Sequence, residues 1–164
     1  MPPRDRRCKN TTVPSYYAAR TSDSLLQAAK QAATRKWWDH GCSGFDLFTS
    51  LETLDEAGKG DSQMAADRLG LLKDIPLLPL PDEGLELARQ LVVSGIVPPK
   101  AASDALHIAV ASVHRIDYLV TWNFKHIANP FIRDRLRSAV AGAGFELPVM
   151  CSPDELLPNE DEDD

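Results

Sequence analysis

The chain has 164 residues, of which 43% are hydrophobic, which suits one compact domain, and no apolar run approaches the roughly 20 residues that a membrane span requires. The formal net charge is −6, and residues 160–164 alone carry five negative charges, so the rest of the chain is close to neutral. A near-neutral body offers no broad basic face for duplex nucleic acid, so any nucleic acid would have to be gripped locally.

The first ten residues, MPPRDRRCKN, carry several charges. No apolar run follows them, so the segment does not predict a secretory signal peptide, and we expect a cytoplasmic protein. In a central parallel strand, alternate side chains face two buried layers, and burying the charges of residues 5–9 there would be strongly unfavourable. We therefore expect residues 1–10 to form no well-packed buried strand.

Helices and strands are predicted to alternate along the rest of the chain. Helical patterns fall at about residues 22–38, 53–57, 61–72, 82–94, 99–113 and 131–140, and strand patterns at about 45–50, 75–80, 118–121 and 146–150. This alternation favours an α/β three-layer sandwich with a mostly parallel central sheet. Pro76 and Pro79 suit an edge strand, because proline cannot donate a hydrogen bond to a neighbour.

The helix predicted at 22–38 has a capping signal and an apolar repeat. Ser22 or Asp23 is expected to cap its first turn. The apolar residues that recur at helical spacing are Leu25, Leu26, Ala29, Ala33 and Trp37.

The helix predicted at 99–113 is apolar on almost every side, so it must be buried. Asp104 and His107 lie three residues apart on one face, and an unpaired buried carboxylate would be costly. One interpretation is that Asp104 interacts with free backbone N–H groups at the helix start and that His107 is a core histidine with partners. The other is that the two residues belong to a functional site. On this helix alone the first interpretation is favoured.

The segment RIDYLVTWNFKHIAN adds polar residues at the end of a strand. The strand ends at Thr121 and delivers Asn123, Lys125 and His126 to the carboxyl edge of the sheet, where open α/β sheets bind ligands. Asp104 would lie close to them. Taken singly, Asn123 could instead cap a helix and His126 could be a packed helix residue.

The run SDALHIAVASVHRIDYLVTWNFKHIAN closely resembles the C-terminal motif region of PIN-domain proteins, including toxin-like members of the VapC group. The family pairs an aspartate on a buried helix with a short strand that ends in threonine and is followed by a polar or acidic residue. Asp104 and Asn123 occupy these two places. The resemblance therefore implies a PIN-like fold.

Two upstream segments extend the resemblance. SLETLDE offers Ser50 followed by Glu56 as the family's helical acidic residue, with Glu52 and Asp55 as neighbours that could take its place. TTVPSYYAAR resembles the loop and helix that follow the family's first strand. The PIN-like domain is expected to cover 11–157, with 1–10 as an atypical or damaged first-strand region.

The resemblance also implies a site for Mg²⁺ or Mn²⁺. Its implied ligands are Asp104, Glu56, Asn123 and Asn10, of which the first three are also the implied catalytic residues. Lys125, His126 and Arg20 are candidates for contact with the substrate phosphates. Asn10 and Asn123 stand where the family usually has acidic residues, so metal affinity is expected to be weak.

Two functions stay open. The first is a metal-dependent ribonuclease, the toxin of a type II toxin–antitoxin pair, with single-stranded or looped RNA as substrate and an antitoxin and a second copy as partners. The second is a degenerate PIN module that binds RNA or protein without cleavage, which Asn10 and the polar first segment favour. A structural α/β domain whose polar groups are caps is a third interpretation. Residues 158–164 are predicted to be a disordered acidic tail.

Overall fold

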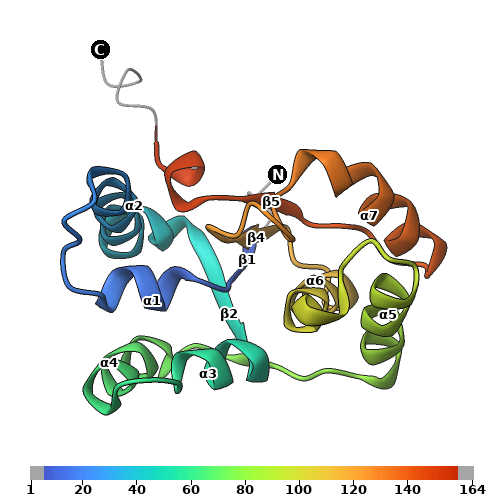
Figure 1. Ribbon diagram of the computed structural model, residues 1–164, viewed down its shortest axis with the longest axis horizontal. Coiled ribbons are helices and arrows are strands. Elements are labelled where there is room, and N and C mark those ends of the chain that lie inside the picture. Colours follow the sequence, from blue (N-terminus) through green and yellow to red (C-terminus); the bar gives the residue numbers. More distant parts are fainter. Residues whose placement is uncertain (1–5, 159–164) are drawn as a thin grey trace.

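A five-stranded sheet forms the centre of the computed structural model, which describes residues 6–158 (Figure 1). All strand pairs are parallel, in the order β3-β2-β1-β4-β5. The strands are β1 (Arg6–Asn10), β2 (Phe45–Ser50), β3 (Leu77–Leu78), β4 (Tyr118–Val120) and β5 (Val149–Cys151). The protein therefore has a Rossmann-like α/β fold, which confirms the predicted class.

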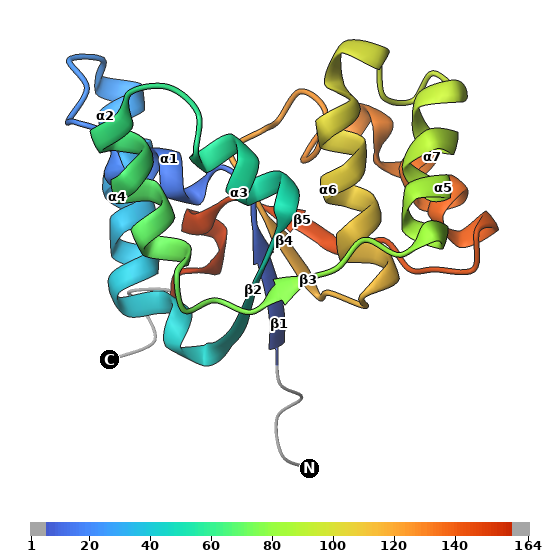
Figure 2. The ribbon, with the colours of Figure 1, turned by 90° about the horizontal axis from the view of Figure 1, so that it is seen from below.

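Helices cover both faces of this sheet. They are α1 (Val13–Ala18), α2 (Leu25–Lys36), α3 (Leu51–Ala57), α4 (Ser62–Leu72), α5 (Asp82–Val93), α6 (Ala102–Val113) and α7 (Pro130–Gly142). Figure 2 shows α1, α2 and α4 on one side of the strands and α5, α6 and α7 on the other. Within residues 6–158, no helix is both long and apolar enough to cross a bilayer.

The strand β1 lies at the centre of the sheet, between β2 and β4, so the expectation that residues before Thr11 form no buried strand is wrong. Cys8, Lys9 and Asn10 are each fully buried. The predicted absence of the sheet's centre is therefore corrected for residues 6–10, while residues 1–5 lie outside the described part of the chain.

The charges of β1 are accommodated one by one. Arg6 is exposed at the start of the strand. The Arg7 guanidinium lies 4.7 Å from the centre of the Phe48 ring and donates to the carbonyl of His114. Lys9 is the charged residue of β1 that enters the core completely, and it does so beside polar partners. The charges of residues 6–9 are therefore not buried together, contrary to the expectation from the sequence: Arg6 is exposed, Arg7 is half-buried and Lys9 is fully buried.

The helix α2 begins later than predicted, and a different face is buried. Ser24, not Ser22 or Asp23, caps it by accepting a hydrogen bond from the Gln27 backbone N–H at 3.5 Å. Leu25 and Leu26 are exposed, so these apolar residues do not pack against the core as part of the repeat. The inward residues of this region are Gln31, Thr34 and Trp37.

Other boundaries shift by a few residues. The strand predicted at 75–80 shortens to β3, which lies at the edge of the sheet as Pro76 and Pro79 indicate. The helix predicted at 99–113 starts as a 3-10 turn at Pro99–Ala101 and continues as α6. Most of the predicted acidic tail, residues 159–164, lies outside the described residues.

Candidate functional site

His107 on α6 joins two other elements through its ring. Its Nδ1 lies 3.0 Å from Lys9 Nζ on β1, and its Nε2 lies 3.0 Å from Glu56 Oε1 on α3. Burial lowers the pKa of His107 to about 4, so the ring is neutral near pH 7. A neutral ring with its proton on Nε2 donates to Glu56 and accepts from Lys9. The interpretation of His107 as a core histidine with partners is therefore confirmed.

Glu56 stands half-buried in α3, the short helix that Ser50 caps at the end of β2. Its Oε1 accepts hydrogen bonds from Ser103 Oγ at 2.6 Å and from His107. Burial raises the pKa of Glu56, but these two hydrogen bonds outweigh it, so the pKa lies below its usual value. Glu56 is therefore a fixed, ionised carboxylate.

Lys9 lies beside His107 and was not predicted as a site residue. Its Nζ is fully buried and also lies 3.4 Å from Thr53 Oγ1 and 3.5 Å from the Asn10 carbonyl. Burial lowers the pKa of Lys9 to about 7, against the opposing effect of Glu56. Side-chain contacts therefore join Lys9, His107, Glu56 and Ser103 in series. In the sequence, the only feature that marked Lys9 was its charge.

Asp104 lies half-buried in the first turn of α6, where Ala101 is the cap residue. Burial raises the pKa of Asp104, a hydrogen bond from Asn123 and the charge of His126 oppose this, and Glu56 adds to it. Ser103, the residue before Asp104, donates a hydrogen bond to Glu56 Oε1 at 2.6 Å, so the first turn of α6 lies against α3.

Asn123 uses its side-chain oxygen to cap the turn after β4. The Oδ1 accepts hydrogen bonds from the backbone N–H groups of Lys125 at 3.2 Å and His126 at 3.0 Å. The oxygen therefore acts as a cap, although the segment it caps, residues 124–127, is a turn and not the helix considered from the sequence. The amide N–H₂ of Asn123 takes no part in these two hydrogen bonds.

Asn10, at the carboxyl end of β1, has a buried side chain. Neither Oδ1 nor Nδ2 has a hydrogen-bond partner among the described residues. Buried amides are nearly always satisfied, so such an orphan marks a place where a further group fits. Of the predicted phosphate contacts, Lys125 is exposed, His126 is half-buried, and Arg20 is exposed in the loop between α1 and α2.

The donor set for a divalent ion is small. Within residues 6–158, no group of three or more His, Cys, Asp or Glu side chains could hold a metal ion. Magnesium, however, often keeps several waters and is held by one or two carboxylates together with substrate phosphates. Glu56 and Asp104, with the orphaned amide of Asn10 nearby in the fold, fit a site of that weaker kind, while Asn123 contributes no free oxygen.

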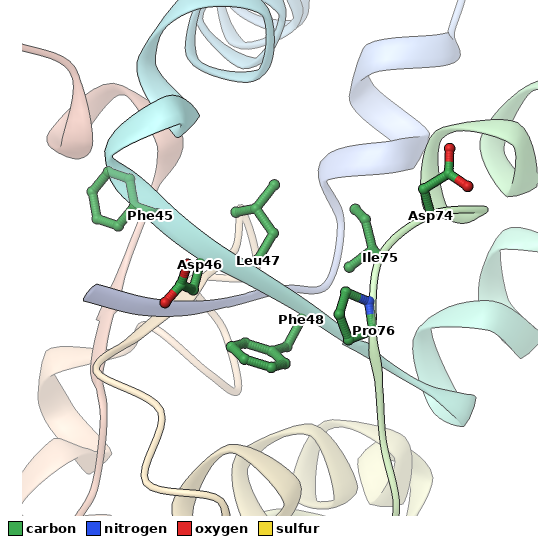
Figure 3. A pocket seen from close by; sticks show the side chains of 7 residues that line it. All are labelled: Phe45, Asp46, Leu47, Phe48, Asp74, Ile75 and Pro76. Carbon is green, nitrogen blue, oxygen red and sulfur yellow. The ribbon is translucent and has the colours of Figure 1, made fainter. Parts of the chain in front are cut away.

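An open pocket lies elsewhere, along β2 and the segment that precedes β3 (Figure 3). Its lining residues are Phe45, Asp46, Leu47, Phe48, Asp74, Ile75 and Pro76. None of these is a predicted site residue, and most are apolar. This pocket and the predicted site are therefore separate.

Comparisons with protein-family models, with curated proteins and with solved structures give no significant match to this chain. The proposed function therefore rests on the geometry of residues 6–158 and on the sequence resemblance given above.

Proposed function

We propose that this protein is a PIN-type, metal-dependent ribonuclease that cleaves RNA phosphodiester bonds. One observation supports this most: at the carboxyl edge of the sheet, where Asn10 ends β1, the Glu56 carboxylate on α3 is hydrogen-bonded to Ser103 and His107 of α6, the helix that carries Asp104 in its first turn. That edge is where parallel α/β sheets place ligands.

In this proposal Glu56 and Asp104 hold Mg²⁺ or Mn²⁺, and water and substrate phosphate complete the coordination. The ion would polarise the phosphodiester as a Lewis acid. The protein's own residues fix one carboxylate: Ser103 and His107 hold Glu56. Lys125 and His126, whose backbone N–H groups donate to Asn123 Oδ1, are the residues proposed to contact phosphate.

The proposal extends to the biological setting implied by the resemblance. We propose a toxin of a type II toxin–antitoxin pair, with an antitoxin and a second copy of the chain as partners. RNA with unpaired nucleotides is the expected substrate, because splayed bases can enter a local site that duplex cannot.

A second candidate function is RNA or protein binding without cleavage. It is favoured by Asn10 in place of a carboxylate and by Lys9, whose buried amine lies on the other side of His107 from Glu56. A protonated Lys9 supplies part of the positive charge that a metal would otherwise bring. Cleavage and binding must therefore be measured separately.

The deciding experiment is Asp104→Asn, assayed on labelled single-stranded RNA with Mn²⁺. The substitution keeps the size of the side chain and removes its charge, so the fold should persist while cleavage falls by about 100-fold or more. Circular dichroism checks the fold. Equal cleavage by wild type and Asp104→Asn would exclude this site, and binding without cleavage by both would favour the second candidate.

Glu56→Gln, with Glu52→Gln as its matched control, tests which glutamate of α3 acts. Glu56 has the hydrogen bonds to Ser103 and His107, and Glu52 lies one turn earlier on the same helix. We expect Glu56→Gln to lose most of the Mn²⁺-dependent cleavage and Glu52→Gln to retain it. The reverse pattern would assign the ligand to Glu52.

A further inference from the structure

Three aromatic rings gather around the strand end that carries Asn123. The ring centres of Tyr16 and Trp122 lie 5.8 Å apart, and those of Trp122 and Phe124 lie 6.0 Å apart. Lys30 Nζ lies 5.5 Å from the Trp122 ring centre and 5.6 Å from that of Phe124. We call Tyr16, Lys30, Trp122 and Phe124 the aromatic platform.

The central ring of the platform is fixed by hydrogen bonds. The Trp122 indole N–H donates to Thr34 Oγ1 at 2.8 Å, and the Trp122 backbone N–H donates to Thr12 Oγ1 at 2.8 Å. Thr34 is fully buried in α2. An aromatic surface held in this way loses little conformational entropy when a ligand stacks on it.

The platform is also accessible and positively charged. Phe124 is 43% exposed, and Tyr16, Lys30 and Trp122 are half-buried. Over the described range, Lys30 forms no ion pair with a carboxylate, so its ammonium is available to an anion. One exposed ring and two half-buried rings beside a cation without a carboxylate partner match the two parts of a nucleotide, a flat base and a phosphate.

The platform lies next to the proposed cleavage site. Trp122 and Phe124 flank Asn123 just after β4, whose Val120 pairs with Asn10 of β1. A nucleotide stacked on these rings would therefore lie at the carboxyl edge of the sheet, where the proposed site is.

We propose that the aromatic platform binds an unpaired base of single-stranded RNA by stacking, with Lys30 contacting the adjacent phosphate. This inference rests on the proposed ribonuclease function and names the part of the substrate that the protein grips. An apolar protein segment is the disfavoured occupant, because it would give Lys30 no anion to contact.

The test measures binding without cleavage. An eight-nucleotide oligouridylate and the same backbone with abasic sites are titrated into the full chain in EDTA, with Trp fluorescence and anisotropy as readouts. We expect Phe124→Ala to weaken oligouridylate binding by about 5- to 150-fold, the range that stacking supplies per base. Phe124→Trp should retain binding. Phe131→Ala is the matched control, because Phe131 is 92% exposed at the start of α7 and forms no ring contact within the described chain.

The abasic ligand separates stacking from charge attraction. Wild type should bind it more weakly than oligouridylate by a similar factor, and Phe124→Ala should bind the two ligands equally. Equal affinity of wild type and Phe124→Ala for oligouridylate, with both variants folded by circular dichroism, would overturn the proposal. Because the titration uses no metal, this failure is distinct from a failure of cleavage, which the Asp104→Asn assay reports.

Discussion

Asn10 ends β1 with a buried side-chain amide that has no hydrogen-bond partner within the described residues. A carboxylate at this position would have the same shape but would carry a charge that burial opposes. The residue therefore limits how strongly the proposed site can hold a divalent ion, since Glu56 and Asp104 are the only acidic ligands proposed there.

We predict that Asn10→Asp makes the protein less stable without metal and more responsive to it. An unpaired buried charge costs about 1–3 kcal/mol or more, so the melting temperature should fall by roughly 2 to 12 °C in EDTA. Mn²⁺ should then raise it by more than it raises that of wild type, because a ligand of the native state stabilises it. Thermal melts with and without Mn²⁺ measure both effects.

Asn10→Ala is the control for this prediction. It removes the amide without adding a charge, so it should show no increased response to Mn²⁺. If Asn10→Asp and Asn10→Ala respond alike to Mn²⁺, Asn10 does not face the proposed ion.

At the scale of the element, β1 combines a central place in the sheet with a fully buried lysine. Burial lowers the pKa of Lys9 in the folded chain to about 7, below the ordinary lysine value of 10.5. Between these values the unfolded chain binds more protons than the folded one, so stability rises with pH across this window. Below pH 7 the folded chain must bury a protonated amine, so the penalty on the free energy of unfolding is present in full.

We predict that Lys9→Met removes this part of the pH dependence. From pH 7 to pH 10, the free energy of unfolding of wild type should rise relative to that of Lys9→Met by a few kcal/mol. Each unit of pKa shift corresponds to about 1.4 kcal/mol. Urea unfolding at several pH values measures it. The matched control is Lys73→Met, which changes an exposed lysine at the end of α4 and should follow wild type at every pH. Parallel pH curves for wild type and Lys9→Met would show that Lys9 is not buried as described.

At the scale of the whole molecule, residues 6–158 contain all five strands of the sheet and the helices on both of its faces. The chain's acidic end, 160–164, adds five negative charges and no apolar side chain. Such a run has nothing to bury, and its charges repel one another.

We predict that deletion of residues 160–164 leaves the melting temperature within about 2 °C of the full chain, since the run offers no apolar side chain to bury and surface changes stay within about 0.5 kcal/mol. Calorimetry in low salt is the sharpest measurement, because screening is weakest there. A large drop would show that this run docks on a basic surface, for which the arginines of α7 are the nearest candidates in the sequence.

The fold class could be predicted because its signals are local. The strand at β2 and the helices α4 and α6 follow from short patterns of apolar residues and caps, which act within a few residues of the chain. The face of α2 could not be predicted, because Gln31 is turned inward by hydrogen bonds with Ser22 and Arg20, residues of the preceding loop. Local hydrophobicity gives no sign of such a contact.

The α/β class and the buried helix with Asp104 and His107 could be predicted from the sequence alone, because both follow from periodicity. The central place of β1 in the sheet and the burial of Lys9 there became visible only in the folded chain. The reason is that a buried charge is tolerated or excluded according to its partners, and those of Lys9 lie 44 and 98 residues away, at Thr53 and His107.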